Sequence, residues 1–243
     1  MSKLGFFHIA VRNHRATRFV VENVRAHHKT EPYILFSDAG EDFSYLASEY
    51  SITTVTDEIR TGPPIGSYGY RLLQILEFFS RFKHACEISG AEYLVMLEDD
   101  VLVLKQITVP DGCEFMGHIQ GGNIFNSKVA DIIKQFSGNY DIVPIYACGG
   151  GSIFKTSIFL DNYEKIINFY VNNTDHIQRF YPTWGWIDCF MHIYYLLAGA
   201  KYTTNLYMDD THNHRPGFNY TAYLEKLPDT MQIVNNFKKY YYE

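Results

Sequence analysis

The stretch that decides the fold is Tyr93–Val101, which reads YLVMLEDDV. An uninterrupted apolar run of this length predicts a short strand that is buried on both of its faces. The run stops at three adjacent acids, Glu98, Asp99 and Asp100. We therefore expect a buried central strand whose carboxyl end carries a cluster of negative charge.

The residues before this stretch alternate between strand and helix periodicity. The expected strands are Leu4–Val11, 33–38 and Ser51–Thr56, and the expected helices are 15–29, 43–50 and 72–89. Continuous apolar strands that alternate with helices predict an α/β fold, with a mostly parallel central sheet covered by helices on both faces. Ligands of such sheets bind beyond the carboxyl ends of the strands, where Arg12, Asp38 and the three acids are expected.

The second half of the chain is less regular. We expect strands at Cys113–Gln120, Ile142–Ala147 and Lys201–Met208, and helices at Val129–Phe136, Phe154–Tyr170 and Trp186–Ala198. No repeat, low-complexity tract or linker divides the chain, so we expect a single domain over residues 1–243. The tail Lys238–Glu243 carries no recognisable signal.

Composition excludes several classes of protein. Apolar residues make up 47% of the chain and charged residues 20%, which predicts a sizeable core rather than disorder. The net charge of −6 argues against a nucleic-acid partner, because phosphate binding needs a basic face. No apolar run is long enough to span a membrane, and the first residues lack the apolar core of a secretory signal, so we expect a cytoplasmic protein, of viral or bacterial origin among others. The cysteines, which form no CxxC pair, are expected to be buried thiols: Cys86, Cys113, Cys148 and Cys189.

The acids Glu98, Asp99 and Asp100 are the sharpest chemical feature. Adjacent carboxylates repel one another unless a cation or hydrogen-bond donors lie nearby. Oxygen ligands of this kind suit Mg²⁺ or Mn²⁺ that bridges a diphosphate. The alternative is a solvated turn or a helix N-cap, where aspartate is common.

YLVMLEDDV follows a helix that ends in SGAEY, and the chain also carries SDAG at residues 37–40 and Gly69-Tyr70-Arg71 before that helix. In this order the set resembles the nucleotide-sugar half of the GT-A glycosyltransferases, with YLVMLEDDV similar to their DxD strand. The resemblance implies a Rossmann-like GT-A fold in which residues of about 1–104 bind the nucleotide sugar and about 105–243 bind the acceptor.

The resemblance also implies roles for individual residues. Asp100 would bind the metal, and Asp99 and Glu98 would hold the ribose or a metal-bound water. Asp38 would face the base, with Arg71 near it or near the diphosphate. The implied donor-binding positions are Ala10, Val11, Arg12, Asp38, Arg71, Glu98, Asp99 and Asp100. Both arginines could instead be ordinary surface or ion-pair residues.

Two further segments offer groups for a sugar or an acceptor. Gly149, Gly150 and Gly151 allow close approach of a backbone to a ligand, and a helix expected after them would offer N–H groups to anions. Phe154 stands where a Walker A loop needs glycine, so this loop is not a P-loop. The alternative is a flexible turn. The resemblance places the loop beside the sugar and the acceptor.

The other segment is Trp184-Gly185-Trp186, followed by Asp188. Indole faces suit the apolar faces of sugar rings, and a carboxylate can take a proton from a sugar hydroxyl. Alternatively, both tryptophans are core residues and Asp188 caps a helix. The resemblance favours Asp188 as the general base of an inverting transfer.

His212 and His214 follow an expected strand and lie near acids. Two histidines at this spacing indicate a metal more than an isolated histidine does. Several GT-A enzymes complete their metal shell with a late histidine, so the resemblance makes either one a candidate ligand.

The sequence therefore predicts a Mn²⁺- or Mg²⁺-dependent glycosyltransferase that moves a sugar from a UDP- or GDP-sugar to a hydroxyl of a glycan or glycoprotein acceptor. Two alternatives stay open. A sugar nucleotidyltransferase uses a related sheet, although the Gly-rich loop usual after its first strand is absent here. A catalytically silent nucleotide- or carbohydrate-binding module would keep the pocket without turnover.

Overall fold

The computed structural model describes residues 3–38, 40–61, 72–118, 127–141, 149–173, 187–204, 207–210, 218–235 and 237–239. The helices are α1 (His14–His27), α2 (Ser44–Tyr50), α3 (Leu72–Ser89), α4 (Ser127–Ser137), α5 (Thr156–Asn172), α7 (Ile187–Leu197) and α8 (Tyr220–Leu224). The strands are β1 (Leu4–Ala10), β2 (Tyr33–Ser37), β3 (Thr53–Thr56), β4 (Tyr93–Leu97), β5 (Leu102–Val103), β6 (Phe115–Gly117), β7 (Ile153–Lys155), β8 (Tyr202–Thr204), β9 (Met208–Asp210) and β10 (Ile233–Asn235).

A seven-stranded sheet runs through the molecule in the order β3-β2-β1-β4-β7-β6-β8. The first four strands in this order are parallel. Strand β7 runs antiparallel to both of its neighbours, and β6 and β8 are parallel to each other. The expected α/β fold with a mostly parallel sheet is therefore confirmed.

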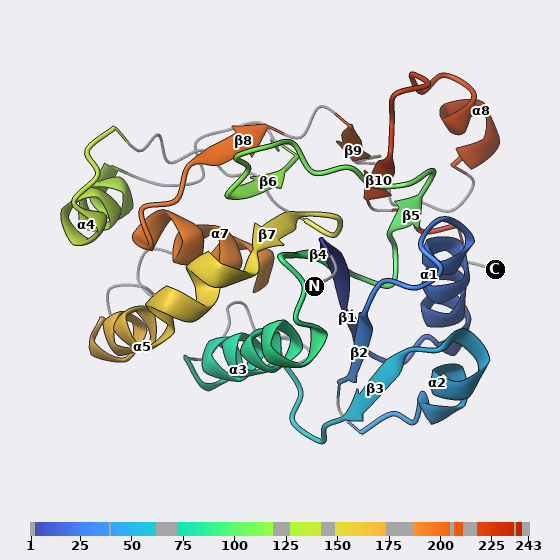
Figure 1. The fold of residues 1–243 in the computed structure, drawn as a ribbon, viewed down its shortest axis with the longest axis horizontal. Coiled ribbons are helices and arrows are strands. Elements are labelled where there is room, and N and C mark those ends of the chain that lie inside the picture. Colours follow the sequence, from blue (N-terminus) through green and yellow to red (C-terminus); the bar gives the residue numbers. More distant parts are fainter. Residues whose placement is uncertain are drawn as a thin grey trace.

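Helices cover both faces of this sheet, also as expected (Figure 1). Side chains alternate along a strand, so Phe6 of β1 packs with Val20 and Val24 of α1, whereas Phe7 packs with the helices of the opposite face. Helices α1 and α2 belong to the first face, and α3, α5 and α7 belong to the second. The covering face thus changes between β1, which leads into α1, and β4, which follows α3.

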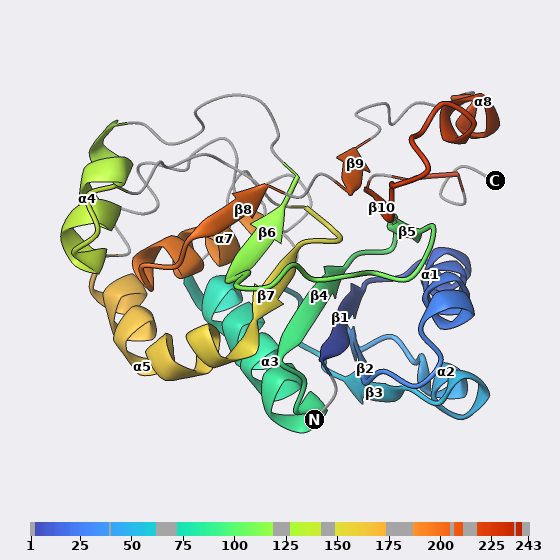
Figure 2. The same ribbon diagram turned by 45° about the horizontal axis from the view of Figure 1, so that its top comes forward.

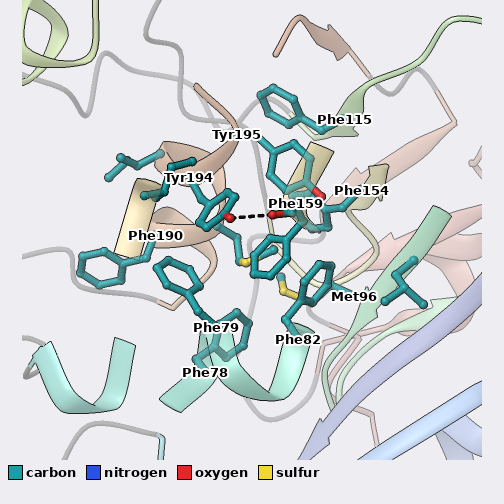
Figure 3. Packing of buried hydrophobic residues seen from close by; sticks show 14 of the residues in the cluster. Phe78, Phe79, Phe82, Met96, Phe115, Phe154, Phe159, Phe190, Tyr194 and Tyr195 are labelled. Carbon is teal, nitrogen blue, oxygen red and sulfur yellow. Dashed lines mark hydrogen bonds between the residues drawn. The ribbon is translucent and has the colours of Figure 1, made fainter. Parts of the chain in front are cut away.

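The core under α3, α5 and α7 is strongly aromatic (Figure 3). The rings of Phe159 and Tyr194 stack with centroids 4.3 Å apart, and Phe79 meets Tyr194 edge-on at 5.1 Å. The Tyr194 hydroxyl donates to the Phe159 carbonyl at 2.7 Å, which satisfies its one polar atom in an apolar surrounding. Many of the aromatic residues counted in the sequence therefore serve packing.

A second, three-stranded sheet joins distant parts of the chain in the order β5-β10-β9 (Figure 2). Strand β5 follows the acids closely, whereas β10 lies near the C-terminus. Their register pairs Val103 with Ile233. This sheet brings the last described residues back to the carboxyl end of β4.

Two expected elements of the second half differ from the structure in their bounds. Phe154, placed at the start of a helix, lies in strand β7, and α5 begins only at Thr156. The segment Lys201–Met208, expected as one strand, contributes β8 to the large sheet and the first residue of β9 to the small one. Periodicity cannot resolve strands of three residues. The expected strand Ile142–Ala147 lies outside the described residues.

The structure bears on two further expectations, which concern membrane spans and the state of the cysteines. Within the described ranges, no helix is long and apolar enough to cross a membrane. Cys86, Cys113 and Cys189 are buried free thiols, as expected, and Cys148 lies outside the described residues.

Candidate functional site

The candidate site lies where β1 and β4 end side by side. The two strands are parallel, and His8 pairs with Leu97, so Val11 and Arg12 follow β1 at the same edge where the acids follow β4. The covering helices change face between these strands. In open α/β sheets, ligands bind outside the carboxyl ends of the strands at such a switch point.

Asp99 is buried and faces inward rather than toward solvent. Its Oδ1 accepts hydrogen bonds from the Thr17 hydroxyl at 2.7 Å and from His8 Nε2 at 3.0 Å. Its Oδ2 accepts from the Val11 amide at 3.4 Å. These donors come from β1, α1 and the turn between them, so Asp99 ties the end of β4 to the start of α1. The role implied for Asp99 toward ribose or a metal-bound water stays a prediction.

Tyr33 completes the network behind Asp99. Its hydroxyl lies 2.7 Å from Nδ1 of His8. Burial, and then the charge of Asp99, raise the pKa of Tyr33 well above its usual range, so the phenol stays protonated. When Tyr33 donates to Nδ1, Nε2 of His8 carries the proton that Asp99 accepts. The charge of Asp99 is thereby compensated inside the protein.

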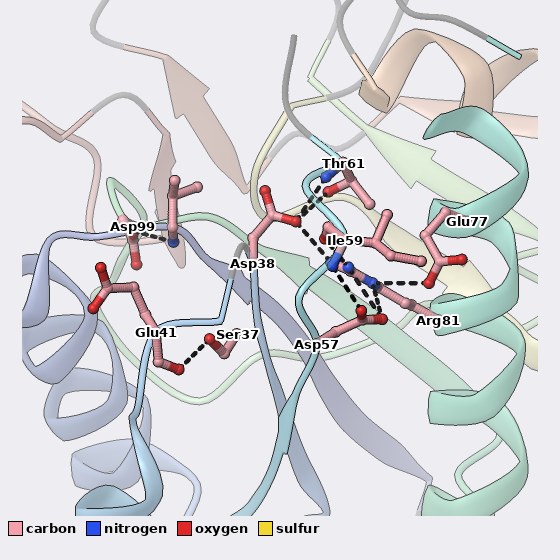
Figure 4. Close-up of polar contacts among 10 residues, drawn as sticks. Ser37, Asp38, Glu41, Asp57, Ile59, Thr61, Glu77, Arg81 and Asp99 are labelled. Carbon is pink, nitrogen blue, oxygen red and sulfur yellow. Dashed lines mark hydrogen bonds and ion pairs between the residues drawn. The ribbon is translucent and has the colours of Figure 1, made fainter. Parts of the chain in front are cut away.

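Asp38, at the end of β2, is fully buried and paired (Figure 4). Its Oδ1 lies 2.9 Å from Nη1 of Arg81 in α3, and it accepts from the backbone amide and the hydroxyl of Thr61 at 2.7 and 3.1 Å. Arg81 also pairs with Asp57 at 3.2 Å and Glu77 at 3.3 Å. Asp38 therefore fixes the chain that leaves β3. Its implied contact with a base stays a prediction.

Sequence reasoning missed Arg81. The signal was present, because this arginine lies between Phe79 and Phe82 on the apolar side of its helix. Arginine is almost never fully buried without a partner, so a buried carboxylate could have been expected nearby. The cluster places three carboxylates around one guanidinium. Burial, and then a hydrogen bond with Asp57, raise the pKa of Glu77.

Asp100 has different neighbours from Asp99. Its Oδ2 lies 3.6 Å from Nζ of Lys238, and its carbonyl accepts from the Phe237 amide at 2.6 Å. Both partners belong to the segment that follows β10. The tail, which carried no signal in the sequence, thus reaches the central acids. No local pattern could have found Lys238, because 138 positions separate it from Asp100 (238 − 100).

Glu98 is only partly buried, and the glycine loop packs next to it. A Cβ atom on Gly150 would lie 2.4 Å from Cγ2 of Val101, 3.0 Å from Oδ1 of Asn235 and 3.3 Å from Oε2 of Glu98. Gly151 has a φ of +96°, which L side chains rarely adopt. Close packing against the second sheet therefore requires glycine at Gly150, and backbone conformation requires it at Gly151.

The expectation that a helix N-terminus directly follows the glycine loop is wrong. Strand β7 intervenes and runs antiparallel to β4, so α5 begins at the opposite edge of the sheet. The Thr156 amide there donates to the carbonyl of Glu92, the residue before β4. The loop itself does lie beside Glu98, at the same edge as the acids.

Several predicted site residues are not described by the structure. Asp188 is the second residue of α7, and its side chain is outside the description. The sites predicted at Arg71, Trp184, Gly185, Trp186, His212 and His214 also lie outside the described residues. The chain that leads to both histidines leaves β9 at Asp210, which pairs with Asn235 shortly before Phe237 and Lys238.

The described oxygen donors at this edge, the carboxylates of Glu98 and Asp100, are of the type that Mg²⁺ and Mn²⁺ bind. Among the described residues, no group of three or more His, Cys, Asp or Glu is arranged to hold a metal ion. Mg²⁺ commonly binds through one or two carboxylates together with substrate phosphates. Asp100 already accommodates a positive charge, the ammonium of Lys238.

A separate pocket lies at the amino edge of the sheet and is lined by Lys3, His28, Glu31 and Thr108, among others. His28 is buried there, and its Nε2 accepts from the Ile107 amide at 3.0 Å while Nδ1 lies 3.2 Å from Glu31. Both ring nitrogens of His28 are therefore engaged by neighbours within the protein.

The fold and this edge define an α/β protein with an acidic cluster at the switch point of a mostly parallel sheet. Beyond this class, neither a scan against models of known protein families nor a search of curated proteins found a match for the chain.

Proposed function

We propose that this chain is a metal-dependent glycosyltransferase that uses a nucleoside-diphosphate sugar as donor. The observation that carries the proposal is the position of Asp100 at the end of β4, at the switch point, with a cationic group 3.6 Å from its carboxylate. Asp99 accepts hydrogen bonds from internal donors, and we assign its neighbours Asp100 and the partly exposed Glu98 to the ligand. The resemblance of YLVMLEDDV to a DxD strand supports the same assignment.

In this proposal, the acceptor hydroxyl attacks the anomeric carbon from the face opposite the diphosphate. A carbon–oxygen bond forms to the acceptor, the bond to the diphosphate breaks, and the diphosphate leaves with the electron pair. Asp188 takes the proton of the hydroxyl as general base. Asp100, with Glu98 close by, would hold a divalent cation, and His212 or His214 would complete its shell. Such a cation would supply charge neutralisation for the leaving diphosphate.

Incubation with a panel of UDP- and GDP-sugars and Mn²⁺, without acceptor, tests the proposal against its alternatives. Slow hydrolysis to UDP or GDP is the expected result. Release of nucleoside triphosphate that depends on added pyrophosphate would instead identify a sugar nucleotidyltransferase. Binding of the nucleotide sugar without either product would indicate the silent module.

Asp188→Asn tests the assignment of the base. A general base contributes roughly 10²–10⁴-fold to a rate, so transfer should fall by about this factor while nucleotide binding stays as in the wild type. Asp161→Asn, on the exposed side of α5, is the matched control and should retain full activity. Equal activity of the two variants would refute the role of Asp188.

A further inference from the structure

Lys238 is held at the acidic edge by its own main chain. The amide of the preceding residue, Phe237, donates to the Asp100 carbonyl at 2.6 Å, and the Lys238 amide donates to the Tyr220 hydroxyl at 3.0 Å. The Phe237 ring packs against Tyr220 at 4.6 Å and against Phe19 of α1 at 6.0 Å. Strand β10 fixes the segment from its other side. The start of the lysine side chain is therefore firmly placed.

The end of the same side chain is less constrained. The Lys238 side chain is 27% exposed, and the 3.6 Å between Nζ and Asp100 Oδ2 is longer than a strong charge-assisted hydrogen bond. Lysine has a flexible four-carbon stem and three rotatable donors. The ammonium can therefore move by several ångströms while its backbone stays in place.

We propose that Lys238 binds the diphosphate of the donor and rests on Asp100 when no donor is bound. The inference deepens the function proposed above and depends on it. A divalent cation on Asp100 would displace the ammonium from that carboxylate. The displaced ammonium would then lie next to the phosphates that the cation brings, and phosphate oxygens are strong acceptors for it.

The negative charge of the acidic edge gives the physical reason why a lysine that binds the diphosphate is needed there. Glu98, Asp99 and Asp100 end one strand, and a diphosphate that approaches them meets negative charge. His8, Thr17 and the Val11 amide compensate Asp99. At Asp100, Lys238 supplies a positive charge from the protein itself. Removing this charge should have opposite effects on a cation and on an anion.

The test compares Lys238→Met by calorimetry with a control, Lys226→Met, which removes an exposed lysine shortly after α8. With saturating Mn²⁺, Lys238→Met should bind UDP or GDP, whichever the wild type binds, about 10-fold more weakly, because it lacks one charge-assisted hydrogen bond. For Mn²⁺ alone, the same variant should bind several-fold more tightly, because no ammonium competes for Asp100. Lys238→Arg should retain most of the nucleotide affinity, and Lys226→Met should match the wild type in both titrations.

The opposite signs separate a ligand contact from a structural role. If Lys238→Met bound nucleotide as tightly as the wild type, or if both affinities fell together, the inference would be wrong even though the proposed function stood. If wild-type protein bound neither UDP nor GDP in the presence of Mn²⁺, the proposed function would fail first, and the role of Lys238 with it.

Discussion

Asp99 and Asp100 are neighbours in the chain, yet they belong to different regions of the molecule. The carboxylate of Asp99 is enclosed by β1 and α1 and accepts hydrogen bonds from His8, Thr17 and the Val11 amide. Asp100 faces the C-terminal segment, where its carboxylate meets the flexible, partly exposed Lys238. The Asp99 carboxylate is preorganised by internal hydrogen bonds, whereas the Asp100 carboxylate forms an ion pair with a side chain that we propose a ligand displaces.

This difference teaches how an acidic strand end can serve stability and binding at once. A carboxylate with buried internal donors fixes the backbone, because removing it would leave those donors unsatisfied. The next carboxylate, Asp100, can then bind a ligand while the fold stays intact. The predictions below test this division, in order of decreasing effect.

The largest effect on stability is expected for Asp99→Ala. The substitution leaves Nε2 of the buried His8 ring without its acceptor and the Thr17 hydroxyl with only the Asn13 carbonyl at 3.0 Å, so it should lower the free energy of unfolding by about 3 kcal/mol in urea titrations. Asp100→Asn should cost only about 1 kcal/mol, because its ion-pair partner is partly exposed. Equal losses for the two variants would break the comparison.

Gly150→Ala should disturb the packing of the residues next to Asp100. Its methyl group would overlap with Val101 and press on Asn235, and overpacking of this kind costs about 2 kcal/mol. Gly112→Ala is the control. It adopts a φ of +72° in open space, so it should cost about 1 kcal/mol through backbone strain alone. Urea unfolding measures both losses. Nucleotide affinity should fall for Gly150→Ala only, and a loss of affinity in both variants would argue against a specific contact.

Tyr33→Phe should weaken the Asp99 region in a pH-dependent way. At pH 7 the lost hydrogen bond to His8 should cost about 1 kcal/mol. The folded-state pKa of Tyr33 is raised, so its contribution is fully present below about pH 10, the pKa in the unfolded chain, and declines as pH rises above that value. The stability advantage of the wild type over the variant should therefore decline above pH 10, by about 1.4 kcal/mol at pH 11, so that the variant becomes the more stable protein near that pH. A difference that stays constant up to pH 11 would show that Tyr33 is not buried as a neutral donor.

The sequence predicted the region around β1 to β4 well, because the information there is local. The run Tyr93–Leu97 matches β4 residue for residue, and the helix expected to close at Ser89-Gly90 ends at Ser89. Continuous apolar runs and helical spacing are visible in short windows. The expected position of the acids at a sheet edge followed from the same patterns.

The short strands of the second half and the partners of the acids could not be predicted in this way, because they depend on contacts between residues far apart in the sequence. Strand β7 has three residues and is defined by its pairing with β4 and β6. Lys238 reaches Asp100 only because β10 pairs with β5 and β9. Arg81 pairs with Asp38, and helical spacing alone does not show which carboxylate a buried arginine meets.

The central claim is that Asp100 holds a divalent cation that binds the diphosphate of the donor. Calorimetric titration of wild type and Asp100→Asn with UDP and GDP, each with Mn²⁺ and with EDTA, tests it most directly. We expect the wild type to bind one nucleotide at least 10-fold more tightly with Mn²⁺ than with EDTA, and Asp100→Asn to lose this difference. Affinity that does not respond to Mn²⁺ in the wild type, or the same response in both proteins, would contradict the account.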